Sequence, residues 1–127
     1  MKREILFRGK QISNGEFIEG SLTVDCHGNC CILHQLNTPL DGGFQFFDVD
    51  PKTVGQFTGM IDKNGKKIFE GDIVNHTRRT ERGVESTNDK VYFDSEMLEF
   101  GLKYSNELFH CQFNKEFEVV GSMDVSE

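Results

Sequence analysis

The sequence has no tryptophan and only two prolines among its 127 residues. Twelve phenylalanines must therefore supply most of the buried aromatic area. The shortage of proline and the absence of any low-complexity run argue against linkers and tails. A chain of this length has the usual size of one domain, and it can bury a core without disulfides or metal as staples.

Long apolar runs are also missing. No run approaches the roughly 20 residues that a membrane-spanning helix needs. The opening MKREILFRGK is positively charged but has no apolar region behind it, so we expect no signal peptide. With four cysteines and no export signal, we expect a cytoplasmic protein with reduced thiols.

Basic charge is scarce in both halves of the chain. The formal net charge is −7, of which residues 1–54 contribute −2 and residues 55–127 contribute −5. Non-specific binding of nucleic acid depends on Lys and Arg that neutralise phosphates, so nucleic acid is a disfavoured partner. Acidic partners and anionic membranes are disfavoured for the same reason, and we expect no membrane association.

The sequence does contain many short runs of apolar residues separated by turn residues, and no sustained helical periodicity. Such runs, spaced by roughly 8–12 residues, are typical of an all-β sandwich or barrel. We expect one brief helical turn, where Asp50 can cap and Pro51 suits the first position. The expected strands are 5–7, 16–24, 30–36, 44–49, 55–61, 67–69, 73–74, 90–93, 98–104, 108–113 and 117–120.

Two connections between these strands carry specific expectations. Asn64-Gly65 lies between two apolar runs, which predicts a tight hairpin whose two central residues both take positive φ. Residues 75–90, NHTRRTERGVESTNDK, form the most polar stretch. They predict an exposed loop, which we expect to be the most mobile internal region.

That stretch contains the only basic cluster, formed by Arg78, Arg79 and Arg82. A solvated loop is the default interpretation of three such residues. The alternative is a contact with a partner's carboxylate or phosphate, because the guanidinium group offers two parallel donors.

One group of potential metal ligands stands out: Cys26, Cys30, Cys31 and His34, with His27 nearby. Structural zinc sites usually combine two matched pairs of ligands, and no second pair is present here. Adjacent cysteines in a strand would also face opposite sides of the sheet. The sequence therefore favours half-buried free thiols, with a zinc site as the alternative.

Candidate catalytic groups also have simpler interpretations. His110 and Cys111 would point apart in a strand, so the imidazole could not activate the thiol directly. Glu70 and Asp72 could form a carboxylate pair, but a turn-capping role for Asp72 is favoured at this tight corner. Four glycines at strand–turn corners do not precede a helix, as the glycines of a phosphate-binding loop would. These four are Gly55, Gly59, Gly65 and Gly71. We expect no catalytic, cofactor-binding or metal site, and no enzyme activity.

The segment Thr53–Val74, TVGQFTGMIDKNGKKIFEGDIV, resembles the signature block of the YopX-like proteins of bacteriophages and prophages. The opening REILFRGK, the segment NGEF, the lead-in DVDPKTVGQ and the closing FEVVGSM resemble that family in the same order. The stretches 26–44 and 77–89 do not align with it. The resemblance implies a β-rich N-terminal part, 1–51, and an SH3-like barrel in the C-terminal part, 52–127, with little helix and the two parts in one compact unit. It assigns no catalytic or binding residues.

Taken together, these features predict an all-β, non-enzymatic phage or prophage accessory protein without cofactors. We expect it to bind a phage or host protein, with Arg78, Arg79 and Arg82 as the contact. One alternative is a nucleic-acid-associated small-barrel module. Another is an acidic decoy that occupies a host nucleic-acid-binding protein. The sequence is also compatible with a homo-oligomer.

Overall fold

The computed structural model describes residues 4–35, 43–103, 107–108 and 117–125, and for residues 78–80 and 107–108 it describes the backbone alone. This part of the chain is all-β, as predicted, with two antiparallel sheets and no α-helix. It contains no helix with the length and apolar character needed to cross a membrane. The chain divides into two compact units: an N-terminal unit of Met1–Phe57 with Asp124–Glu127, and a C-terminal unit of Thr58–Met123.

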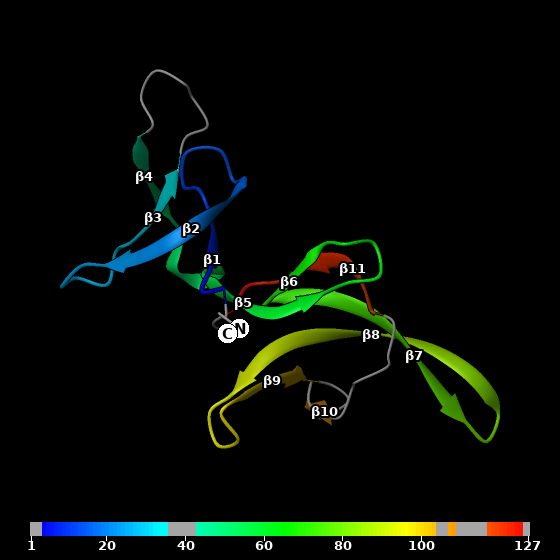
Figure 1. The fold of residues 1–127 in the computed structure, drawn as a ribbon. Coiled ribbons are helices and arrows are strands. Elements are labelled where there is room, and N and C mark those ends of the chain that lie inside the picture. The colour runs from blue at the N-terminus through cyan, green and yellow to red at the C-terminus, as the bar shows by residue number, and fades with distance from the viewer. Residues whose placement is uncertain (1–3, 36–42, 104–106, 109–116, 126–127) are drawn as a thin grey trace. The chain divides into compact units, whose positions relative to one another are not determined.

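The strands follow one another in short antiparallel steps (Figure 1). In chain order the elements are β1 (Phe7–Lys10), β2 (Phe17–Val24), β3 (Cys30–Gln35), β4 (Phe44–Val49), η1 (Pro51–Thr53), β5 (Gly55–Ile61), β6 (Lys67–Phe69), β7 (Asp72–Thr80), β8 (Gly83–Asp94), β9 (Glu99–Leu102), β10 (Glu107–Leu108) and β11 (Phe117–Ser122).

The N-terminal unit is built on a meander in which β4, β3, β2 and β1 pair in that order, with the start of β5 beside β1. Its apolar core is small, since Ile32, Val49 and Phe57 are the hydrophobic side chains buried in its described part. Arg8 adds to this core because its guanidinium lies 4.1 Å from the centre of the Phe17 ring. The first strand was expected at 5–7 but spans Phe7–Lys10. Its residues FRGK include two charged side chains, so it lacks the apolar run that identified the other strands.

A short 3₁₀ turn, η1, ties the end of β4 to β1 and confirms the predicted helical turn. The Asp50 carboxylate accepts a hydrogen bond from the Lys52 amide at 3.1 Å. The Thr53 hydroxyl donates to the Asp50 carbonyl at 2.7 Å and accepts from the Lys10 amide at 2.9 Å. These bonds fix the chain where it leaves the meander.

The C-terminal unit contains a five-stranded antiparallel sheet in the order β10-β9-β8-β7-β11. Its core is a cluster of buried side chains: Ile68, Val74, Val91, Phe100, Leu102 and Phe117. The last strand, β11, returns beside β7, the first strand of this sheet. Among the described residues no ladder joins β10 to β11, so a closed barrel is not seen there.

The hairpin between β5 and β6 forms where predicted but with a different turn. Gly65 has φ +83°, whereas Asn64 keeps a negative φ. The Gly65 amide donates to the Asp62 carbonyl at 3.0 Å, and the Asp62 amide donates to the Lys66 carbonyl at 2.7 Å. This is a three-residue loop closed by one left-handed glycine, so the prediction of positive φ at both central residues was wrong. The Asp62 carboxylate organises the turn by accepting from the Asn64 and Lys66 amides.

The largest difference from the sequence-based prediction concerns residues 75–90, which are not a loop. The strands β7 and β8 run through this stretch and stay paired up to Thr80 and Gly83. Its threonines and valine favour extended backbone, although both faces are polar enough to look like a loop. The absence of an apolar alternation therefore concealed a β-hairpin.

Candidate functional site

The outer half of the β7–β8 hairpin forms an arm, defined here as residues 77–87. Within the described part of the chain, β11 pairs with β7 only as far as His76, and β9 pairs with β8 only from Val91 onward. Between these limits the two strands pair with each other alone. Residues 81–88 are all exposed, and the end of the hairpin extends beyond β9, β10 and β11 (Figure 1).

The structure places the three predicted contact residues on this arm. Arg78 lies opposite Glu85 and Arg79 opposite Val84 in the ladder. Arg82 is in the turn that follows β7, and its side chain is exposed. The side chains of Arg78 and Arg79 fall outside the described atoms. The three residues therefore belong to a paired ribbon and its turn, rather than to a free loop.

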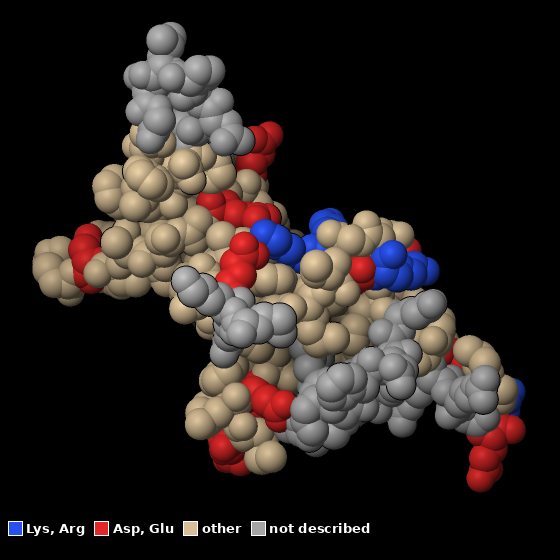
Figure 2. All heavy atoms as spheres, viewed as in Figure 1, with Lys and Arg blue, Asp and Glu red and all other residues tan. Residues whose placement is uncertain are grey.

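The arm is mixed in charge. Its eleven residues include three arginines and two glutamates, in a chain of net charge −7. On the face shown in Figure 2, the described basic and acidic side chains are interspersed, and no continuous basic surface is visible there. The arm is thus a weakly positive element of an acidic protein.

Two sets of side chains fasten the base of the arm. On one face, the side-chain Nδ2 of Asn75 donates to Asn88 Oδ1 at 3.0 Å, and the Ser86 hydroxyl donates to Asn75 Oδ1 at 2.9 Å. These bonds cross between β7 and β8 just where the pairing with β11 ends. They hold the two strands in register at the start of the arm.

On the opposite face the base is anchored in the core. His76 Nε2 lies 3.5 Å from Asp89 Oδ2, and both side chains are fully buried. The imidazole also meets the Phe117 ring edge-on, with 6.0 Å between the ring centres. Sequence reasoning missed this pair. The alternation Asp72, Val74, His76 along β7 could have indicated that His76 points inward, but not that Asp89 on β8 is its partner.

The cysteine and histidine cluster does not converge on one point. Cys31 Sγ donates to Asp48 Oδ1 at 3.1 Å, whereas His34 Nδ1 lies 2.6 Å from the Glu19 carbonyl oxygen. Alternation along β3 places Cys30 and His34 on the face opposite Cys31. Across the described ranges, no set of three or more His, Cys, Asp or Glu side chains is arranged to hold a metal ion.

Two thiols of this cluster, Cys30 and Cys31, have a raised pKa. The hydrogen bond to Asp48, reinforced by burial, raises the pKa of Cys31. Burial and the nearby charge of Asp25 raise the pKa of Cys30. A thiol whose pKa is raised is a weaker nucleophile at neutral pH. Cys26, Cys30 and Cys31 are free thiols, and the predicted His110–Cys111 pair lies outside the described residues.

The candidate carboxylate at the β6–β7 corner has a structural role. Asp72 is buried, and its Oδ2 accepts a hydrogen bond from the Phe69 amide at 2.8 Å. This confirms the expectation that Asp72 caps the turn. Glu70, two residues earlier, is half-buried.

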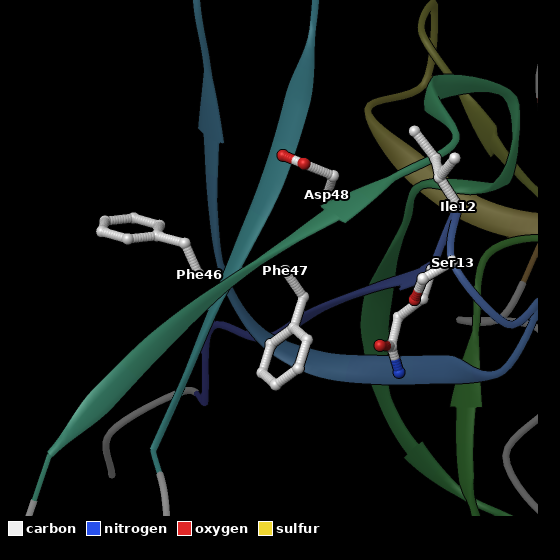
Figure 3. A pocket seen from close by; sticks show the side chains of 6 residues that line it. Ile12, Ser13, Phe46, Phe47 and Asp48 are labelled. Carbon is white, nitrogen blue, oxygen red and sulfur yellow. The ribbon is translucent and has the colours of Figure 1, made fainter.

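Two shallow hollows lie beside β4 in the N-terminal unit, and they share Ile12 and Asp48. One, of about 330 Å³, is bounded by the turn Gln11–Ser13 and by Phe46, Phe47 and Asp48. Figure 3 shows the Phe46 and Phe47 side chains leaving β4 on opposite sides. The hollow lies where the segment after β1, which is hydrogen-bonded to β4 up to Ile12, turns away from that strand.

Comparison with known protein families identifies the family of this chain. The family model described as YopX protein matches residues 6–123. The chain belongs to the YopX family.

The match covers both units of this YopX-family chain and includes the whole arm. It also confirms the resemblance seen in the sequence around Thr53–Val74. Neither a curated protein nor a solved structure matches the chain.

Proposed function

We propose that this YopX-family chain is a non-enzymatic phage or prophage accessory protein that acts by binding another protein through its arm. The observation that carries the proposal is that the hairpin continues past the sheet as a paired ribbon with residues 81–88 exposed. A two-stranded ribbon is marginally stable by itself, because it buries little apolar surface. Its extension beyond the core is therefore explained best by contacts that it makes with a partner.

Chemistry elsewhere supports a binding role over catalysis. The pKa of the Cys30 and Cys31 thiols is raised, which makes them weaker nucleophiles, and the buried Asp72 carboxylate accepts a hydrogen bond from the Phe69 amide. The hollows beside β4 are lined by apolar and neutral polar side chains and by two carboxylates, Asp25 and Asp48, each of which already accepts a hydrogen bond. Such groups do not form a nucleophile with its base and acid.

The proposal includes the SH3-like form of the C-terminal unit. The return of β11 beside β7 brings the last strand next to the first strand of a meander. That arrangement is needed before a five-stranded sheet can curl toward a barrel. A small barrel would present the arm from a rigid base, which suits an element that binds.

The partner should offer acidic or mixed-charge groups to the arm. Three arginines on an acidic protein give a local attraction that is short-ranged at physiological ionic strength. Such a contact orients a partner and sets the association rate. A phage or host protein with an acidic patch fits this chemistry.

The test is a pull-down of phage and host proteins with the whole chain as bait. Replacing Arg78, Arg79 and Arg82 by Ala should abolish retention of the partner without changing the melting temperature. The matched control replaces Lys63, Lys66 and Lys103, three basic residues of the same unit that lie off the arm, by Ala. Retention that is lost equally in the control would mean that overall charge, and not the arm, does the binding.

One observation favours a second candidate, a nucleic-acid-associated module. The major groove of DNA admits a two-stranded β-ribbon, and the arm is such a ribbon with three arginines. If these arginines neutralise three phosphates, the logarithm of the binding constant should fall with a slope of about −3 against the logarithm of salt concentration. Tight duplex binding with that slope would replace the protein-binding proposal.

A further inference from the structure

The strand β4 (Phe44–Val49) lies at the end of the N-terminal sheet, with β3 on one side. Its C-terminal end is covered on the other side by the chain after β1. There the Asp48 carbonyl accepts from the Ile12 amide at 3.0 Å, and the Asp50 amide donates to the Lys10 carbonyl at 2.9 Å. No other strand in the described part of the chain lies along this edge before Asp48.

The hydrogen bonds of Asp48 and Asp50 reveal which backbone groups of β4 face the open edge. In an antiparallel ladder, successive residues direct their N–H and C=O groups alternately to the two sides of the strand. Asp48 and Asp50 face away from β3, so Phe44 and Phe46 do so as well. Their amide and carbonyl groups are therefore presented at the edge of the sheet, while those of Gln45 and Phe47 face β3.

This edge lacks the features that usually protect an exposed strand. The stretch 43–47, Gly-Phe-Gln-Phe-Phe, contains no charge and no proline. The side chains of Phe44 and Phe46 are 62% and 61% exposed. Soluble proteins normally place Lys, Pro or a bulge on such a strand to prevent pairing with another chain.

We propose that two copies of this chain associate through β4, paired antiparallel about a two-fold axis beside Gln45. In this register Phe44 of one copy lies opposite Phe46 of the second, and each such pair exchanges its N–H and C=O groups. Every open backbone group of Phe44 and Phe46 in both copies then has a partner. The two phenylalanines also stack across the strands on one face, an arrangement that stabilises antiparallel pairs.

Two features favour a second copy as the occupant of this edge. The chain carries a net charge of −7, so identical copies repel unless they meet at an uncharged surface, and 43–47 is such a surface. The register is also self-complementary, as a two-fold interface requires. It places Gly43 of the second copy opposite Phe47, one of the residues that line the hollow at Gln11–Ser13.

Sedimentation velocity of the whole chain, from low to high micromolar concentration, tests this association. The wild-type chain should shift from monomer to dimer. Phe46→Pro should raise the dimer dissociation constant at least tenfold, because it removes an edge N–H while leaving the bonds to β3 in place. Phe46→Lys should have the same effect. The control Ile61→Lys, at an exposed apolar position of the other unit, should leave the dimer intact.

A cross-link gives a second measurement that does not depend on the Phe46 variants folding. The two-fold axis brings Gln45 of each copy opposite the other in a non-hydrogen-bonded pair, with Cα atoms about 4.5 Å apart. Gln45→Cys should then form a disulfide to itself, identified by mass spectrometry of the linked peptide. A wild-type chain that stays monomeric, a dimer that neither Phe46 variant weakens, or no Gln45→Cys disulfide would each overturn the proposal.

Discussion

The β7–β8 hairpin has two halves that share one continuous ladder but differ in what surrounds them. At the base, Val74, His76, Asp89 and Val91 are all fully buried. In the arm, residues 77–87, the described side chains beyond Arg82 are exposed, and Val84 is 68% exposed. The comparison teaches that burial makes the base part of the folding unit, whereas the arm depends on its own pairing and on any partner that it meets.

The largest effect is expected at Asp62, which ties the β5–β6 turn to β11, the strand that pairs with the base of the hairpin. Its carboxylate accepts from the Val119 amide of β11 at 3.0 Å as well as from the β5–β6 turn. Asp62→Ala leaves these amides without their acceptor and should lower the free energy of unfolding by about 3 kcal/mol. Urea unfolding followed by circular dichroism measures this. A loss below about 1 kcal/mol would mean that water replaces the carboxylate.

The same residue predicts a dependence on pH. Burial raises the pKa of Asp62, but hydrogen bonds from the Val119, Lys66 and Asn64 amides outweigh it, so the pKa lies below its ordinary value. Asp62 therefore stabilises the fold above the ordinary carboxyl pKa, and this contribution is lost as pH falls through the lower folded pKa. The stability difference between the wild-type chain and Asp62→Asn should shrink on acidification. A difference that is constant with pH would contradict this.

The same Val→Ala substitution at two positions of β8 compares the base of the hairpin with the arm. Val91→Ala removes buried methyl groups from the core of the C-terminal unit and should cost about 2 kcal/mol. Val84→Ala, in the exposed arm, should change stability by less than about 0.5 kcal/mol. If thermal unfolding showed that both substitutions lower the stability equally, the arm would be buried in solution.

Two glycines with positive φ allow a similar comparison, between the β5–β6 turn and the turn at the tip of the arm. Gly65, with φ +83°, closes the β5–β6 hairpin, and Gly83, with φ +115°, follows the turn at the tip of the arm. Valine strains both positions. Gly65→Val should lower stability by about 1 kcal/mol or more. Gly83→Val should open the arm tip locally and change global unfolding by less than about 0.5 kcal/mol. Gly121→Val, at a position with ordinary φ and open space, is the control.

Local pattern predicted much of this fold. The alternation in β2, β3, β4 and β5 and the cap at Asp50 placed these elements within a residue or two. The arm was missed because its described side chains are exposed and its sequence lacks the apolar alternation that identifies a half-buried strand. The YopX family to which the chain belongs could be recognised from the segment Thr53–Val74, yet that segment lies outside the arm.

The candidate site was only partly predictable for a related physical reason. The arginines could be singled out because charge is visible in a sequence. The anchors of the arm could not, because the contact of His76 with Asp89 depends on the register between two strands. The open edge at Phe44 and Phe46 was equally hidden, since phenylalanine in a strand normally predicts burial.

Hydrogen exchange of the native chain, resolved by residue, tests the division between base and arm most directly. The account predicts that ladder amides of the arm exchange through local opening, far faster than the amides of Ile68, Val74 and Val91, which require global unfolding. Protection of the arm equal to that of these core residues would contradict it. The hairpin would then be one folding unit throughout, and its outer half could not be the free binding element proposed here.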